Sequence, residues 1–244
     1  MHRLLVSAAD LGCEEPSLNE GAARHLRVLR PKDGEEVELF DGAGKSRVYR
    51  YDAGRRGLVA SADVVESVRR DGLILFACVT KGSRWDWTIE KATELGVTRI
   101  VPVISERTIV RIREEERAGK RERWMRIAED AARQSDAKWL PEIDEAVDFR
   151  GALEIVKGTR CFVGALTKPM PPTILRALEA ADLKESGKAL AMFVGPEGDF
   201  TPEELAALLE IATPVSFGET ILRAETAAIY GVSILRAVID ARVS

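Results

Sequence analysis

Two patterns of apolar residues divide the chain into an N-terminal and a C-terminal part. In the first 70 residues, short segments alternate between apolar and polar side chains, which is typical of half-buried strands. From Leu73 onward, continuous apolar runs alternate with amphipathic helical patterns, which is typical of a parallel α/β sheet. We therefore place a domain boundary near Arg70-Asp71, with domains at 1–70 and 71–244.

The N-terminal part is predicted to be a small antiparallel barrel or curled sheet. Turn-forming pairs such as Asp33-Gly34 and Asp41-Gly42 separate its strands, which we expect at 36–40, 46–52 and 57–65. One helix precedes them, opened by a capping box from Ser17 to Glu20. Its apolar face comprises Ala22, Leu26 and Leu29.

The C-terminal part is predicted to hold buried parallel strands at the apolar runs LILFACVT, RIVPVI, RCFVGAL and ALAMFV, with a further short strand at 214–217. A long apolar helix closes the chain. In open α/β sheets, ligands bind at the carboxyl ends of the strands. The loops after these runs are therefore the first places to look for chemistry.

Composition excludes several classes of protein. The 36 basic and 40 acidic residues nearly cancel, so the whole chain has no general electrostatic attraction for nucleic acid. Two histidines and three dispersed cysteines supply almost no ligands for a transition metal, and we expect no metal and reduced cysteines. The longest apolar run, Leu73 to Val79, is far short of the roughly 20 residues of a membrane span. We expect a cytoplasmic protein with no membrane contact.

The first candidate binding loop is Gly195-Pro196-Glu197-Gly198-Asp199-Phe200, directly after the strand AMFV. Glycines there allow backbone amides to approach a ligand closely. The next residues, from Thr201, predict a helix start with a capping box closed by Glu204. The loop is also compatible with an ordinary strand-to-helix turn.

A second glycine-containing loop runs from Gly218 to Ala227, after the next strand. Ile221 and Leu222 in this loop are either core residues or the apolar walls of a site for a flat heterocycle. Arg223 beside them is harder to explain by packing. Neither loop contains a phosphate-binding motif, so a nucleoside without phosphates suits the site best.

Three segments resemble signatures of one known family. KGSRWDWTIEKATELGVTRIVPVISERT from Lys81, FVGPEGDFTPEE from Phe193 and FGETILRAETAA from Phe217 are similar to motifs of the ribosomal RNA small subunit methyltransferase E family, and HLRVLRPKDGEEVELFDGAG from His25 resembles its PUA-like barrel. The resemblance covers nearly the whole chain. It implies a SPOUT-type α/β fold with a C-terminal trefoil knot and a homodimer. The implied reaction is methylation of N3 of uridine 1498 in 16S rRNA of the assembled small ribosomal subunit, with S-adenosylmethionine as donor.

The resemblance also implies which residues bind the donor. They come from the ends of three strands: Leu166, Val194, Gly195, Pro196, Glu197, Gly198, Phe217, Gly218, Ile221, Leu222, Arg223 and Thr226. The chain departs from the family pattern at Asp199, where glycine is usual, at Glu219-Thr220, where Pro-Arg is common, and at Ala224.

The chemistry of this methyl transfer suggests two catalytic residues. Uridine N3 reacts as its proton leaves and negative charge spreads onto the flanking carbonyl oxygens, so a fixed cation stabilises the transition state. Arg223 suits that role and cannot be the base, because guanidinium stays protonated. Glu225 is the candidate proton acceptor, although a carboxylate at a helix N-terminus is also favoured simply by the helix dipole. Water is an alternative base.

Basic residues that suit the RNA substrate lie in both parts. Arg24, Arg27 and Arg30 recur every three residues on the N-terminal helix, and together with Lys81 and Arg84 they could contact phosphates. A solvated helix face explains the arginines equally well.

Two other functions remain open from the sequence. A nucleotide-binding hydrolase or dehydrogenase is disfavoured by the missing phosphate motifs and the missing pairing of a nucleophile with a histidine. A non-catalytic RNA-binding or ribosome-assembly factor on the same fold would keep the motifs without turnover. Donor binding discriminates between this factor and the enzyme.

Overall fold

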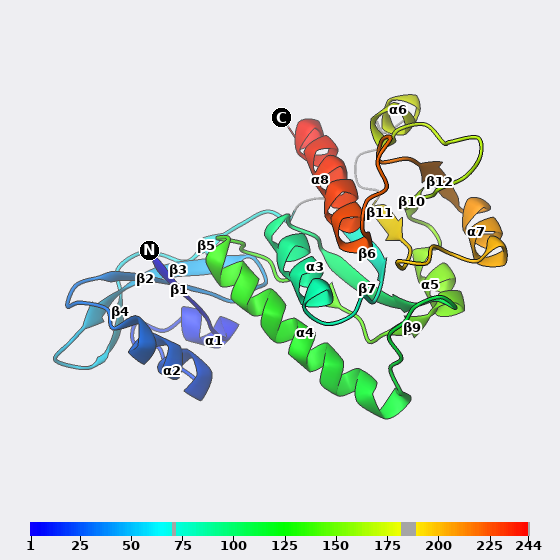
Figure 1. Cartoon of the computed structure of the whole chain (residues 1–244). Coiled ribbons are helices and arrows are strands. Elements are labelled where there is room, and N and C mark those ends of the chain that lie inside the picture. The colour runs from blue at the N-terminus through cyan, green and yellow to red at the C-terminus, as the bar shows by residue number, and fades with distance from the viewer. Residues whose placement is uncertain (70–71, 182–188, 244) are drawn as a thin grey trace. The chain divides into compact units, whose positions relative to one another are not determined.

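The computed structural model describes residues 1–69, 72–181 and 189–243 (Figure 1). It divides into two compact units: a first unit of Met1–Arg70 with Glu129–Leu140, and a second of Asp71–Ala128 with Pro141–Ser244. The boundary expected at Arg70-Asp71 lies outside the described residues. Residues 129–140, which we expected in the C-terminal domain, belong to the first unit.

The first unit contains a mixed five-stranded sheet. Its strands are β1 (His2–Leu5), β2 (Glu36–Phe40), β3 (Lys45–Asp52), β4 (Gly57–Ala60) and β5 (Val65–Glu66), in the order β1-β2-β3-β4 with β5 beside β3. The expected strand 57–65 is thus two strands. The purely antiparallel arrangement is also wrong, because β1 pairs parallel with β2. The segment between β1 and β2 is long enough for the crossover connection that a parallel pair needs.

Two helices of the first unit, α1 (Ala8–Leu11) and α2 (Glu20–Leu29), lie between β1 and β2 in the chain. The cap of α2 is Asn19, whose Oδ1 accepts a 2.8 Å bond from the Ala22 amide, and not Ser17 as expected. Asparagine is as strong an N-cap as serine and lies directly before the first helical residue. The expected apolar face is confirmed, because Ala22 and Leu26 are buried in the core of the unit.

A buried ion cluster ties residues 129–140 to this sheet. Arg3 donates to Glu38 at 2.6 Å and to the Ala132 carbonyl at 2.7 Å, and Lys138 donates to the other Glu38 oxygen. Burial acts to raise the pKa of Glu38, but its hydrogen bonds from Lys138 and Arg3 outweigh burial and leave the pKa below its ordinary value. The segment joins the first unit through charges far apart in the sequence.

The second unit is built on a seven-stranded sheet in which every pairing is parallel. The order is β12-β10-β11-β6-β7-β8, with β9 beside β7. The four expected apolar runs form its central strands, and the expected strand 214–217 lies two residues earlier. The strands are β6 (Leu73–Cys78), β7 (Arg99–Ile104), β8 (Glu142–Ile143), β9 (Val147–Asp148), β10 (Arg160–Gly164), β11 (Leu190–Val194) and β12 (Ala212–Val215).

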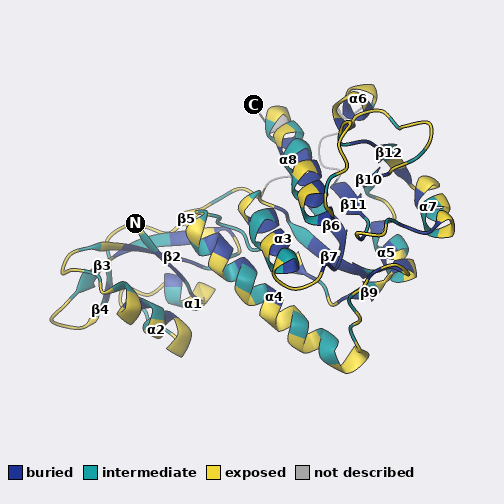
Figure 2. Cartoon of the chain, in the orientation of Figure 1, coloured by how far each residue is buried: buried dark blue, intermediate teal, exposed yellow. Residues whose placement is uncertain are grey.

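Helices cover both faces of this sheet, as the buried positions in Figure 2 show. Successive residues of β6 point to opposite cores: Leu75 packs in the cluster that includes residues of α3 and α8, and Phe76 in the cluster that includes residues of α5 and α7. The helices are α3 (Ser83–Glu94), α4 (Glu114–Gln134), α5 (Phe149–Val156), α6 (Ile174–Ala180), α7 (Pro202–Leu209) and α8 (Ala224–Val243). The predicted parallel α/β class is therefore confirmed, including the long C-terminal helix.

Two of the three cysteines are buried in the sheet of the second unit. Cys78 and Cys161 are free and buried on strands, and burial raises their pKa values to about 11 and about 12. Cys13 is free and exposed. Within the described residues no helix is long and apolar enough to cross a membrane, and no group of three His, Cys, Asp or Glu side chains is placed to hold a metal.

Candidate functional site

A cavity of about 580 Å³ opens at the carboxyl ends of β10, β11 and β12. We call it the strand-end cavity. Three loops line it, at 164–170, 194–199 and 215–224. Its volume lies in the usual range for a small-molecule site. The loops that begin at Gly195 and Gly218 therefore line a single cavity.

Ten of the twelve expected donor-binding residues line this cavity. They are Leu166, Val194, Gly195, Pro196, Glu197, Phe217, Gly218, Ile221, Leu222 and Arg223. Gly198 and Thr226 do not line it: both are exposed, and Thr226 lies in the first turn of α8. The Gly198 carbonyl is engaged by Arg107 instead.

The cavity walls are mostly apolar. Ile221 is 80% exposed and Leu166 62% exposed, so neither is a core residue. Leu222 is half-buried and packs partly against the core. Phe217 is also half-buried, and its ring meets that of Tyr230 edge-on at 5.6 Å. Apolar side chains left exposed at a cavity mouth suit a flat heterocycle, which would cover them.

Two glycines shape the cavity. A Cβ at Gly164 would lie 2.6 Å from the Phe217 ring, so only glycine leaves room for this aromatic wall. Gly218 has φ 110, which side chains rarely tolerate. Both positions are thus fixed by local geometry.

A neighbouring loop, after β7, holds the 195–200 loop in place. Arg107 Nη1 donates to the carbonyls of Gly198 at 3.0 Å and Phe200 at 3.2 Å. The Glu106 amide donates to Glu204 Oε1 at 2.9 Å, while the expected capping box between Thr201 and Glu204 is present. Sequence reasoning gave Arg107 no role, although it lies within the quoted VISERT segment. One signal could have pointed to Arg107: the family-like segment that contains it continues beyond the end of β7, into the loop.

Asp199 occupies the left-handed region, with φ 58. This geometry explains why glycine is usual there and why aspartate is tolerated. The Asp199 Oδ1 accepts a 2.8 Å bond from the Phe200 amide, a local bond of the kind that helps short polar side chains adopt this conformation. The departure from the family pattern thus leaves the loop intact.

Comparison with known proteins identifies the family. A family model described as an RNA methyltransferase domain matches residues 69–236, and a second, an RNA methyltransferase PUA domain, matches residues 18–61. The protein named ribosomal RNA small subunit methyltransferase E from Mycobacterium bovis is 30% identical over 210 residues, which cover 84% of this chain and 79% of the relative. The chain belongs to the ribosomal RNA small subunit methyltransferase E family.

Two further members extend the match to nearly the whole chain. The Synechocystis methyltransferase E is 28% identical over 247 residues, covering 98% of this chain and 78% of the relative. The crystal structure of the Neisseria gonorrhoeae methyltransferase E, bound to S-adenosyl methionine, superposes with a TM-score of 0.82 at 27% identity and covers 98% of both chains. The methyltransferase E family thus accounts for both units.

The charged residues near the strand-end cavity differ in whether they line it and whether they are paired. Arg223 is exposed and lines the cavity, and no ion pair engages it within the part of the chain that the structure describes. Glu225 does not line the cavity, and its Oε2 is buried without a hydrogen-bond partner among the described residues. Arg84, expected to contact RNA, pairs with Glu197 at 3.1 Å. It therefore touches the cavity loop.

The remaining residues expected to bind RNA are exposed. Arg24 and Arg27 lie on α2, and Lys81 precedes α3. Arg30 is not part of the helix face as expected, because it is the C-cap of α2 with a left-handed φ of 48. Arg24 approaches Glu20 only at 4.0 Å, so its charge remains largely available to solvent or phosphate.

Proposed function

We propose that the protein methylates N3 of uridine 1498 in 16S rRNA of the assembled small ribosomal subunit, with S-adenosylmethionine as donor. It works in the cytoplasm as a homodimer, with a trefoil knot in the second unit and with the first unit positioning the RNA. The observation that carries the proposal is the strand-end cavity, which brings ten expected donor-binding residues together, among them Arg223, which has no ion pair among the described residues. The S-adenosyl methionine bound to the Neisseria relative supports the choice of donor.

The cavity suits this donor. Leu166, Ile221 and Leu222 offer apolar walls to an adenine ring, and the loops lack the phosphate-binding pattern that a nucleotide cofactor needs. Glu219 supplies a carboxylate near a ligand with a sulfonium and an ammonium group, and Glu197, paired with Arg84, supplies a second. When bound, the donor supplies an electrophilic methyl group. The task of the chain is then to hold donor and acceptor close and aligned.

Arg223 is assigned to the developing charge on the uracil oxygens. Its guanidinium lines the cavity and stays protonated, so it stabilises the anionic uracil without removing the proton. Because no ion pair engages it within the described residues, its charge is not already neutralised. Pre-placed charge of this kind requires no reorganisation during the reaction.

The N3 proton goes to Glu225 or to water. Glu225 lies in the first turn of α8, where a carboxylate also compensates the helix dipole, but its buried Oε2 lacks a hydrogen-bond partner in the described structure, which is costly for a purely structural group. Since Glu225 does not line the cavity, a bridging water is needed on that route. Glu225→Gln separates the two: a large loss of turnover supports Glu225, and unchanged turnover assigns the proton to water.

Mass spectrometric mapping of 16S rRNA tests the reaction directly. In cells that lack the protein, the 3-methyluridine at position 1498 should be absent, and the parent gene should restore it. Retention of this modification in the deleted strain refutes the assignment. Ribosome binding without S-adenosylmethionine binding would instead support the non-catalytic assembly factor.

A further inference from the structure

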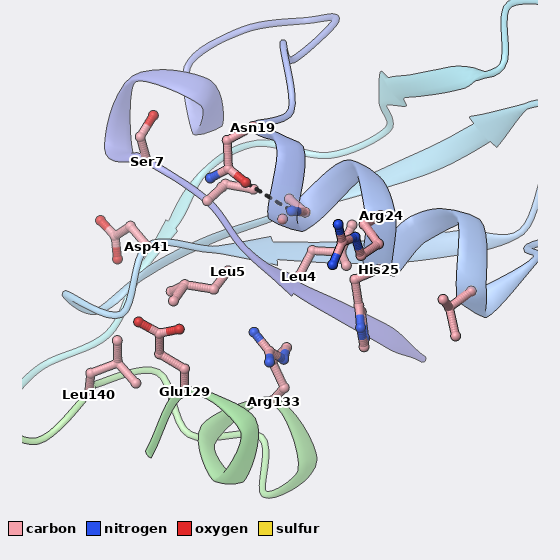
Figure 3. A pocket seen from close by; sticks show the side chains of 14 residues that line it. Leu4, Leu5, Ser7, Asn19, Arg24, His25, Asp41, Glu129, Arg133 and Leu140 are labelled. Atoms are coloured by element: carbon pink, nitrogen blue, oxygen red, sulfur yellow. Dashed lines mark hydrogen bonds between the residues drawn. The ribbon is translucent and has the colours of Figure 1, made fainter. Parts of the chain in front are cut away.

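A second pocket, of about 570 Å³, lies wholly within the first unit. We call it the N-terminal pocket. Its walls come from β1, α2 and residues 129–140, three segments that are far apart in the sequence (Figure 3). The strand-end cavity and the donor site have no part in it. No residue that we assign to methyl transfer lines it.

The lining of the N-terminal pocket is divided by charge. Figure 3 shows Asp41 and Glu129 on one side of the apolar Leu5, and His25 and Arg133 on the other, with Arg24 close to His25. Such a pocket suits a ligand with hydrogen-bond donors at one end and negative charge at the other.

The two carboxylates are not equally free. Asp41 Oδ1 already accepts bonds from the amides of Ala43 at 2.7 Å and Lys45 at 3.0 Å, which fixes its turn. Glu129 is half-buried and its charge acts on Arg133 one helical turn away, but no hydrogen bond or close ion pair engages its carboxylate within the described ranges of the chain. A carboxylate has two acceptor oxygens, so Glu129 can accept two adjacent donors from a ligand.

The basic side chains of the pocket differ in how far they are neutralised. Arg133 pairs with Asp130, which lies outside the pocket lining, and Arg24 has only the 4.0 Å approach to Glu20. Burial, Arg133 and His2 lower the pKa of His25, because each of them disfavours the protonated ring. An anionic group at this side would relieve that repulsion.

We propose that the N-terminal pocket binds one unstacked guanine nucleotide of the RNA substrate. Glu129 accepts the guanine N1–H and N2–H groups, and Arg133 and Arg24 meet the phosphate. Guanine alone presents two adjacent donors on its pairing edge; uracil has one donor between two acceptors, and adenine and cytosine place an acceptor beside their amino group. Single-stranded bases are commonly read on this edge. The inference rests on the proposed function, because it supplies a second contact to the same RNA.

Inosine, which lacks only the 2-amino group of guanosine, tests the base contact. We would measure binding of the full chain to a single-stranded oligouridine that carries one guanosine, and to the same RNA with inosine, by fluorescence anisotropy. The parent should prefer guanosine by at least about fivefold, since a hydrogen bond to a charged acceptor is lost. Glu129→Gln should abolish that preference. Glu122→Gln, on the same helix but outside the pocket, should keep it.

The phosphate contact has its own variant. Arg133→Ala should weaken both RNAs about equally, with roughly a tenfold loss, whereas Arg126→Ala on the exposed part of α4 should leave both unchanged. Equal affinity of the parent for the two RNAs, no binding of either, or a preference retained in Glu129→Gln overturns the proposal. Thermal unfolding of each variant confirms that the fold is kept.

Failure of the guanine-binding proposal can be distinguished from failure of the proposed methylation. Methylation of small subunits by the parent, with S-adenosylmethionine affinity unchanged in Glu129→Gln, shows that the donor site is intact whatever the pocket does. If the parent does not methylate but discriminates guanosine from inosine, the proposed reaction is refuted and guanine binding in the N-terminal pocket is supported. If it methylates but shows no such discrimination, only the proposal of guanine binding is refuted.

Discussion

The two pockets have nearly equal volumes, about 580 and 570 Å³, but their linings differ in kind. The strand-end cavity is walled by apolar side chains such as Ile221 and Leu222, with Arg223 among them. The N-terminal pocket holds acidic and basic side chains around Leu5 (Figure 3). Volume therefore does not distinguish their ligands. Chemistry does: one lining suits an uncharged heterocycle and the other a polar base with a phosphate.

The pockets also differ in how the fold makes them. The strand-end cavity follows from a parallel sheet, whose strand ends meet at one edge. The N-terminal pocket needs the end of α4 and the residues after it to join a sheet whose other residues lie far away in the sequence. The first kind of site is expected of the fold, and the second depends on contacts between segments that are distant in the sequence.

The largest effect that separates the pockets is expected from Arg223→Ala. Loss of a fixed charge at a developing anion costs about 100- to 1,000-fold in turnover. The fold should be unaffected, because Arg223 is exposed, and S-adenosylmethionine affinity should change little. Single-turnover methylation and calorimetry measure the two quantities. Arg126→Ala is the matched control, and equal turnover in Arg223→Ala and the parent would remove the assigned role.

Gly164→Ala should act on donor binding before chemistry. The added Cβ would meet the Phe217 ring at 2.6 Å and push this wall into the strand-end cavity. We expect the dissociation constant for S-adenosylmethionine to rise at least about tenfold, as for a core position that is overfilled. Gly119→Ala, in the exposed part of α4 with open space around it, should leave donor binding unchanged and stabilise the helix by about 0.5–1 kcal/mol. Equal donor affinity in the two alanine variants would contradict the aromatic wall.

Arg107→Ala should have a moderate effect. It removes the two hydrogen bonds that hold the Gly198 and Phe200 carbonyls, so the 195–200 loop loses its clamp. We expect roughly a three- to tenfold rise in the S-adenosylmethionine dissociation constant. The turnover of the saturated enzyme should be nearly unchanged, which a purely catalytic role would not allow. Arg150→Ala on α5 controls for loss of a surface charge.

The smallest effect is expected on the pH dependence of the stability of the first unit. Because the pKa of His25 lies below its ordinary value, the folded state binds the proton less well than the unfolded state. Neutral His25 therefore contributes to the free energy of unfolding. This contribution is fully present above pH 6.5, decreases as the pH falls below 6.5, and is lost below the pKa of His25 in the folded state. His25→Gln should flatten this slope in urea unfolding between about pH 7.5 and 5. An unchanged slope would place the titration elsewhere.

RNA should reverse the shift of His25. A phosphate in the N-terminal pocket favours the protonated ring, so the pKa of His25 should rise when the guanosine RNA binds. Proton NMR follows this directly, since His2 is the only other histidine in the sequence. A donor analogue in the strand-end cavity should leave the titration of His25 in place.

Sequence patterns were sufficient for much of the second unit. The apolar runs at β6, β7, β10 and β11 fixed the parallel sheet, because strands buried on both faces have few polar positions. The loops at Gly195 and Gly218 were expected at adjacent strand ends, but β10 lies between β11 and β12 in the sheet, and its own end loop completes the cavity. The clamp from Arg107 was missed because it joins residues more than 90 positions apart, and no local pattern encodes such a bond.

The first unit was harder to predict. Its strands are short, so the parallel pairing of β1 with β2 depends on the path of the intervening helices and not on their own pattern. Ser17 and Asn19 are both good caps, and only the chain geometry selects Asn19. No role was predicted for Glu129 and Arg133 from the sequence. Their place in a pocket follows from contacts such as Arg3 with Ala132, which are invisible in sequence.

Calorimetric titration of S-adenosylmethionine into the full chain tests the central claim most directly. We expect saturable binding of one donor per chain, weakened at least about tenfold by Gly164→Ala and unaffected by Glu129→Gln. No saturable binding to the parent, or equal weakening by both variants, would contradict a donor site at the ends of β10, β11 and β12.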